Sequence, residues 1–106
     1  MALQTSATIN GFQYDSLYIS VVQTRKQKLY PKDEQGNYLE PEFKTWVYLQ
    51  AFKDAQAKRD GFPMLPHNHV ICIDGDIASA DIDQALKDSG IVIQQYGIDL
   101  GASTLI

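Results

Sequence analysis

Two apolar stretches decide the fold: LYISVVQTRKQKL at residues 17–29 and FKTWVYLQAF at residues 43–52. In both, apolar residues recur at every second position, which is the period of a β-strand. The first stretch begins with apolar residues on both faces, as a central or covered strand does, and ends in the polar run RKQK. The segment between them, Pro31–Pro41, is rich in turn-forming Asp, Gly and Asn. This pattern predicts a long β-hairpin.

Short elements are expected after the hairpin. Residues 53–61 predict one or two helical turns, begun by Asp54 and ended by Gly61. An apolar loop with two prolines follows, and alternation resumes over His67–Ile73, which predicts another strand.

The C-terminal third predicts a second helix and a last strand. Ala80–Ser89 has one apolar stripe, with Ser79 expected as its N-cap and Gly90 as its C-cap. Ile91, Val92 and Ile93 predict a final buried strand.

At 106 residues, the whole chain (residues 1–106) is expected to form one domain. Residues 1–10 are read as a short strand or an arm, and residues 97–106 as a tail without clear periodicity. The predicted fold class is mainly β (α+β): an antiparallel sheet of at least four strands, sandwich- or barrel-like. A long hairpin and one or two short helices complete it.

The net charge of -4 argues against nucleic-acid binding by the chain as a whole, because such binding neutralises phosphates with Lys and Arg. The charge is uneven. Residues 1–73 contain eight basic and seven acidic residues, a balance of +1, whereas residues 74–106 contain only Lys87 and six aspartates, a balance of -5. The acidic third is either a solvated face or a contact for a basic partner.

The N-terminus lacks the basic and apolar regions of a signal peptide, and no apolar run approaches the length of about twenty residues that a bilayer span needs. Cys72 is the single cysteine, so an intramolecular disulfide is excluded. We expect a protein made in the cytoplasm, without a membrane segment.

A catalytic or metal site finds little support in the sequence. His67 and His69 share a strand face and suit zinc, but Cys72 has the opposite parity and no other His or Cys exists. Cys72 itself is expected to be a buried, inert thiol. The aspartates after residue 73 do not match a calcium loop, and no hydrolase or phosphate-binding motif is present. We expect no enzyme activity and no cofactor; a metal-assisted enzyme at His67 and His69 is the third alternative.

Interaction residues are easier to nominate. Arg25, Lys26 and Lys28 form a basic cluster at the polar end of the hairpin, with Tyr38 and Trp46 expected on the returning strand. Tyrosine and tryptophan are enriched at interfaces because they bury a large area and keep one polar group. A second candidate contact comprises Asp74, Asp76, Asp81 and Asp83.

Two stretches resemble small structural proteins of tailed bacteriophages. One is INGFQYDSLYI at residues 9–19; the other is VYLQAF at residues 47–52, followed by a short helix ending in Arg59-Asp60-Gly61 and a proline-bearing loop. The resemblance implies a β-rich, non-enzymatic subunit that repeats in a symmetric assembly, and it carries over no functional residues. The connection at 31–41 and the acidic helical segment after Asp74 fall outside the pattern.

The sequence therefore predicts a virion or tail structural protein that associates with itself or docks on another virion protein. The alternative is a small adaptor or nucleic-acid-associated module that uses the basic hairpin, for which single-stranded DNA is the ligand to test.

Overall fold

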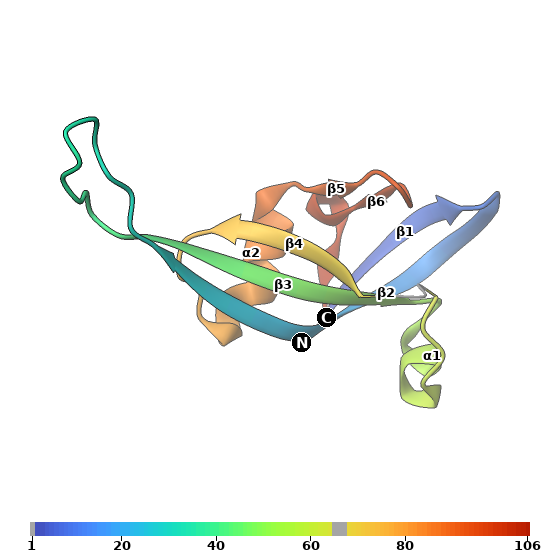
Figure 1. Cartoon of the computed structure of the whole chain (residues 1–106). Coiled ribbons are helices and arrows are strands. Elements are labelled where there is room, and N and C mark those ends of the chain that lie inside the picture. Colours follow the sequence, from blue (N-terminus) through green and yellow to red (C-terminus); the bar gives the residue numbers. More distant parts are fainter. Residues whose placement is uncertain (1, 65–67) are drawn as a thin grey trace.

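The computed structural model describes residues 2–64 and 68–106, and its main feature is one long antiparallel hairpin (Figure 1). The elements in chain order are β1 (Leu3–Ile9), β2 (Phe12–Leu29), β3 (Glu42–Phe52), α1 (Ala55–Asp60), β4 (His69–Asp74), the 3-10 helix η1 (Ser79–Asp81), α2 (Ile82–Ser89), β5 (Val92–Ile93), β6 (Ile98–Asp99), the 3-10 helix η2 (Leu100–Ala102) and β7 (Thr104–Leu105).

The predicted hairpin is confirmed, and it is longer than the sequence suggests. β2 and β3 pair in antiparallel register from Tyr18↔Phe52 to Leu29↔Glu42, with a β-bulge between Val21 and Gln23. β2 also extends back to Phe12, where a tight turn with positive φ at Asn10 and Gly11 joins it to β1. Residues 1–10 were predicted as a short strand or an arm, and the structure has a strand there, β1.

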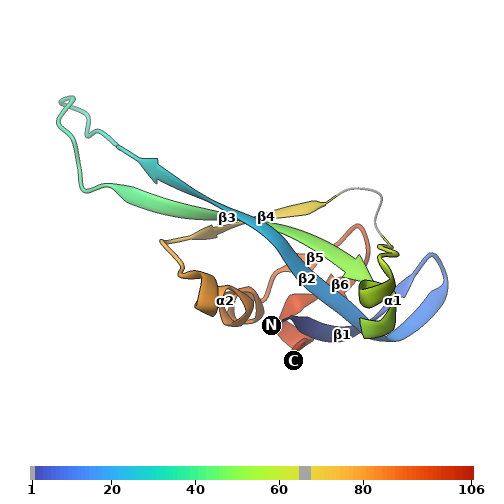
Figure 2. The same cartoon turned by 90° about the horizontal axis from the view of Figure 1, so that it is seen from below.

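The main sheet has the order β4-β3-β2-β1-β7, with all neighbours antiparallel. This confirms a mainly β fold with two short helices. The sheet is open, with β4 and β7 at its edges in the described part of the chain, so the barrel alternative is wrong. Beyond β4 the chain crosses one face of the sheet as α2, η2 and the two-stranded β5-β6 sheet (Figures 1 and 2).

The core lies between that face and the crossing segment. Alternate residues of β1, β2 and β3 are buried, as strand periodicity requires, and they pack against Ile82 and Leu86 of α2 and against Leu100 of η2. The C-terminal tail is thus part of the core. Ile106 and Ala2 exchange backbone hydrogen bonds of 3.2 and 3.0 Å, which fixes both termini beside each other (Figure 2).

Local predictions for the helices are partly confirmed. α1 begins at Asp54, whose carboxylate accepts from the Ala57 backbone N–H at 2.8 Å, and it ends at Gly61 in the left-handed region. α2 ends at Gly90 as predicted, but Ser79 is not its N-cap. Residues 79–81 form the 3-10 helix η1, Asp81 precedes α2, and neither η1 nor α2 has a side-chain cap hydrogen bond.

The last predicted strand is also different. Ile91–Ile93 yields only the two-residue β5, which pairs with β6 outside the main sheet, and Val92 is 45% exposed. β7 forms the actual sheet edge by pairing with Leu3 and Gln4 of β1.

The far half of the hairpin projects from this core. The molecule measures 54 × 25 × 23 Å with a radius of gyration of 16.1 Å, whereas a compact domain of about 100 residues has a radius near 13 Å. In Figures 1 and 2 the ends of β2 and β3 and their connecting loop extend well past α2.

Candidate functional site

The hairpin tip, defined here as residues 28–44, carries four large apolar side chains that are exposed to solvent. Tyr30, Tyr38, Leu39 and Phe43 are 60%, 68%, 53% and 39% exposed. Tyr30 and Tyr38 line a shallow pocket of about 410 Å³. Exposed aromatic side chains gathered at the end of a projection are typical of a contact surface.

The loop that carries these side chains is bridged by hydrogen bonds. The Asp33 carboxylate accepts from the backbone N–H groups of Gln35 and Asn37 at 3.0 and 2.8 Å. The Asp33 backbone N–H donates to the Asn37 carbonyl at 2.9 Å, and Lys32 bridges to Tyr38 as an isolated antiparallel pair. The turn-forming residues therefore build a fixed platform, and fixed loops lose less entropy when they bind.

Two lysines lie over the tip aromatics. The Lys28 ammonium is 5.3 Å from the Tyr30 ring centroid and 5.6 Å from that of Phe43, and Lys32 is 4.7 Å from that of Tyr38. Each such contact at an exposed site contributes about 0.5–1 kcal/mol. The tip thus combines aromatic and cationic groups in one surface.

The strand alternation separates the three basic residues that the sequence analysis grouped. Arg25 lies over Trp46 at 5.8 Å, on the face of the sheet opposite to α2, where Trp46 Nε1 also donates to Gln27 Oε1 at 2.9 Å. Lys28 belongs to the tip. Tyr38 lies in the loop before β3, not on the returning strand, so it and Trp46 do not share one surface.

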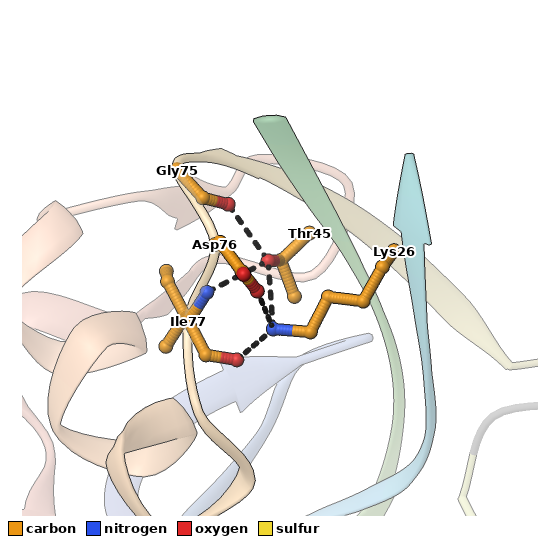
Figure 3. A network of polar contacts seen from close by, with 5 residues as sticks. All are labelled: Lys26, Thr45, Gly75, Asp76 and Ile77. Carbon is orange, nitrogen blue, oxygen red and sulfur yellow. Dashed lines mark hydrogen bonds and ion pairs between the residues drawn. The ribbon is translucent and has the colours of Figure 1, made fainter. Parts of the chain in front are cut away.

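Lys26 points to the other face and ties the chain after β4 to the hairpin (Figure 3). Its ammonium is 2.9 Å from the Asp76 carboxylate and donates to the Ile77 carbonyl and to Thr45 Oγ1. The fully buried Thr45 hydroxyl donates to the Gly75 carbonyl at 2.9 Å and accepts from the Ile77 N–H at 3.2 Å. Lys26 and Asp76 therefore bind each other within the chain, which links the segment after β4 to the hairpin.

The remaining acidic candidates do not form one patch. Asp74 ends β4, with its side chain 92% exposed and 3.9 Å from Lys44. Asp81 is exposed just before α2, but Asp83 in the first turn of α2 is only 7% exposed. Asp83 therefore lies outside the surface that this region can offer a partner.

Of the two histidines considered as metal ligands, only His69 lies among the described residues. His69 is the half-buried first residue of β4, and His67 lies outside the described residues. Within residues 2–64 and 68–106, no group of three His, Cys, Asp or Glu side chains is placed to hold a metal ion. Cys72 is half-buried, less enclosed than predicted, and pairs in register with Trp46.

Leu39 and Phe43 were not among the predicted contact residues. The signal was present, because Leu39 lies among turn-forming and acidic residues and Phe43 next to Glu42, where a core position is unexpected.

Over the described ranges, no helix combines the length and apolarity that crossing a membrane requires. In comparisons with known proteins, no family model, curated protein or solved structure gave a significant match to this chain.

Proposed function

We propose that the chain is a non-enzymatic structural subunit of a tailed-bacteriophage particle, assembled in the host cytoplasm. The observation that carries this proposal is the hairpin tip: a hydrogen-bonded loop that holds exposed aromatic side chains at the end of a projection from the core. Its partner is a second copy or another virion protein.

The shape supports an assembly role. Because the molecule is 54 Å long, the hairpin tip can contact another subunit at a distance from the core of its own chain. The tip aromatics contribute little to that core, since each is more than one-third exposed. Apolar groups that do not stabilise the monomer are favourable where they are covered by a partner.

The charge of the tip favours a protein partner over nucleic acid. Residues 28–44 contain Lys28, Lys32 and Lys44 against four acidic residues, a balance of -1. Single-stranded nucleic acid is bound by aromatic side chains within a positively charged groove. The tip has the aromatic side chains, but its three lysines are outnumbered by acidic residues and it has no net positive charge.

The test is the mass in solution by light scattering behind a sizing column, at two protein concentrations. We compare the natural chain with a Tyr38→Ser, Phe43→Ser variant, and use Phe62→Ser as the matched control because Phe62 is 71% exposed outside the tip. A fixed oligomer that only the tip variant loses supports the proposal.

A monomer at both concentrations rejects self-association and leaves docking on another protein. The adaptor alternative is tested separately by a mobility shift with single-stranded DNA at low salt. A shift that disappears as salt rises, and is lost in the Tyr38→Ser, Phe43→Ser variant, would favour nucleic-acid binding.

A further inference from the structure

Two of the strand edges that have no partner strand within the described residues differ in character. β1 pairs with β2 only as far as Leu3↔Ile19, so residues 20–29 of β2 are paired with β3 on one side and with no strand of the described chain on the other. We call this ten-residue edge the β2 notch. The second free edge is the six-residue β4, whose described partner is β3.

Both edges are accessible. Val22 in the notch is 50% exposed and Val70 on β4 is 43% exposed. A groove of about 350 Å³ lies beside the notch, between residues 21–24 of β2 and residues 79–83 of η1 and α2. An unpaired strand edge can accept a further strand from another chain.

The two edges carry opposite charge. The notch contains Arg25, Lys26 and Lys28 and no acidic residue, whereas residues 69–76 contain Asp74 and Asp76 and no Lys or Arg. The internal Lys26–Asp76 pair removes one charge from each edge. The notch keeps a balance of +2, and the acidic group that β4 offers a partner is the Asp74 carboxylate, which is 92% exposed and lies 3.9 Å from Lys44.

We propose that β4 of one copy of this chain pairs with the β2 notch of a second copy and continues its sheet. The inference deepens the proposed function and rests on its self-association. Asp74 and Arg25 share the sheet face opposite α2, so antiparallel addition can set them against each other, and in that register residues 70–74 of β4 lie opposite residues 25–29 of the notch. Because the two edges differ, the contact is head-to-tail and builds a ring or a filament.

Pairing of each edge with itself is less favourable. Two notches would bring together three cationic side chains from each copy, and like charges directly opposite are destabilising. Two β4 strands would leave both notches without partners. Only the mixed contact satisfies both edges of every copy.

The first test uses the single natural cysteine. With Asp74 opposite Arg25 in an antiparallel pair, Cys72 lies opposite Gln27 of the neighbouring copy. Directly opposite residues have Cα atoms about 4.5–5.5 Å apart, which suits a disulfide. Gln27→Cys should therefore form an intermolecular disulfide with Cys72 under mild oxidation, identified by peptide mass spectrometry. Within one copy these two positions are separated by β3 and by a two-residue offset.

The control is Gln84→Cys, on the exposed side of α2. We expect at least about tenfold more cross-linking at position 27 than at position 84, because a formed contact gives a millimolar effective concentration. Equal cross-linking at both positions overturns the proposal. A Cys72–Cys72 dimer that predominates also overturns it, in favour of β4 pairing with itself.

The second test exchanges the charges. Arg25→Glu alone and Asp74→Lys alone should each weaken association, and an equal mixture of the two variants should restore it, because each altered edge then meets its opposite. Failure of the mixture to recover contradicts the contact. Both tests are repeated in a chain whose residues 30–41 are replaced by Asn-Gly, which removes the tip loop and keeps both edges. Cross-linking that persists there separates this inference from the role of the tip.

Discussion

At the scale of single residues, the buried hydroxyl of Thr45 joins three segments of the chain. This fully buried hydroxyl donates to the Gly75 carbonyl and accepts from the Ile77 N–H and the Lys26 ammonium. Thr45→Val keeps the shape and removes the hydrogen bonds, so we expect the free energy of unfolding to fall by about 1–3 kcal/mol. Urea denaturation measures this change.

Thr24→Val is the matched control. Thr24 lies on β2, paired with Val47, and it is half-buried on the same face of the hairpin. Its hydroxyl takes part in none of the side-chain hydrogen bonds of the described residues. The control should change the free energy of unfolding by less than about 0.5 kcal/mol. Equal losses in the two variants would show that the hydroxyl of Thr45 has no special role.

Lys26 should behave differently from its basic neighbours. Lys26→Gln removes the ion pair with Asp76 and weakens the bond to the Ile77 carbonyl, and we expect a loss of about 0.5–1.5 kcal/mol, because the pair is partly exposed. Arg25→Gln and Lys28→Gln should stay within about 0.5 kcal/mol of the natural chain. Urea denaturation of the three variants at neutral pH makes the comparison, and an unchanged Lys26→Gln protein would contradict it.

Residue periodicity predicts which side chains face the core, but it does not predict that Lys26 alone of the basic cluster is held by an ion pair within the described part of the fold. Arg25, Lys26 and Lys28 are adjacent in the sequence, and strand geometry alone sends Lys26 to the opposite face from Arg25. What holds Lys26 there is Asp76, fifty residues later, which no local pattern contains. Substituting all three basic residues together would thus confuse stability with association.

At the scale of elements, the hairpin loop should be dispensable for folding. Leu29 and Glu42 are paired across the hairpin, so a two-residue Asn-Gly turn can join them in place of residues 30–41. We expect the free energy of unfolding to change by less than about 1 kcal/mol, since the removed residues are outside the core. Leu86→Ala, at a fully buried position of α2, should by contrast cost about 2–5 kcal/mol.

Elements with strong local signals were predictable and those that depend on tertiary contacts were not. The hairpin alternation, the Asp54 cap and the Gly61 and Gly90 ends are all local, and the structure has them. The prediction of Ser79 as the N-cap of α2 was wrong, because residues 79–81 form a 3-10 helix before α2 begins. The chain just before them is held by hydrogen bonds between the Gly75 and Ile77 backbone and the Thr45 and Lys26 side chains, which no local pattern predicts. β7 is two residues long and exists through its pairing with β1, which sequence period cannot reveal.

The candidate site was predictable to a similar extent. Tyr38 and Lys28 were identified from their residue types, yet their surface also depends on Leu39 and Phe43, which are exposed because the hairpin runs beyond the core. The β2 notch depends on where β1 stops pairing. That boundary is a property of the assembled sheet.

At the scale of the whole molecule, a small core at one end and a long projection at the other should give two levels of backbone protection. Amides of β1, of the core half of β3 and of α2 are expected to exchange slowly with solvent, near the rate set by global unfolding. Amides of residues 22–29 and 42–44 lie beyond the main core cluster, so they should exchange faster through local opening.

Concentration then distinguishes the two proposed contacts in one hydrogen-exchange experiment. If copies associate through the hairpin tip, residues 30–41 become protected as the protein concentration rises. If β4 enters the notch, protection rises in residues 25–29 and 70–74 together, because both strands of an antiparallel pair donate backbone N–H groups to each other. Tip protection without notch protection would retain the proposed function and reject the edge contact. Exchange that is independent of concentration at all these positions would reject self-association by either route.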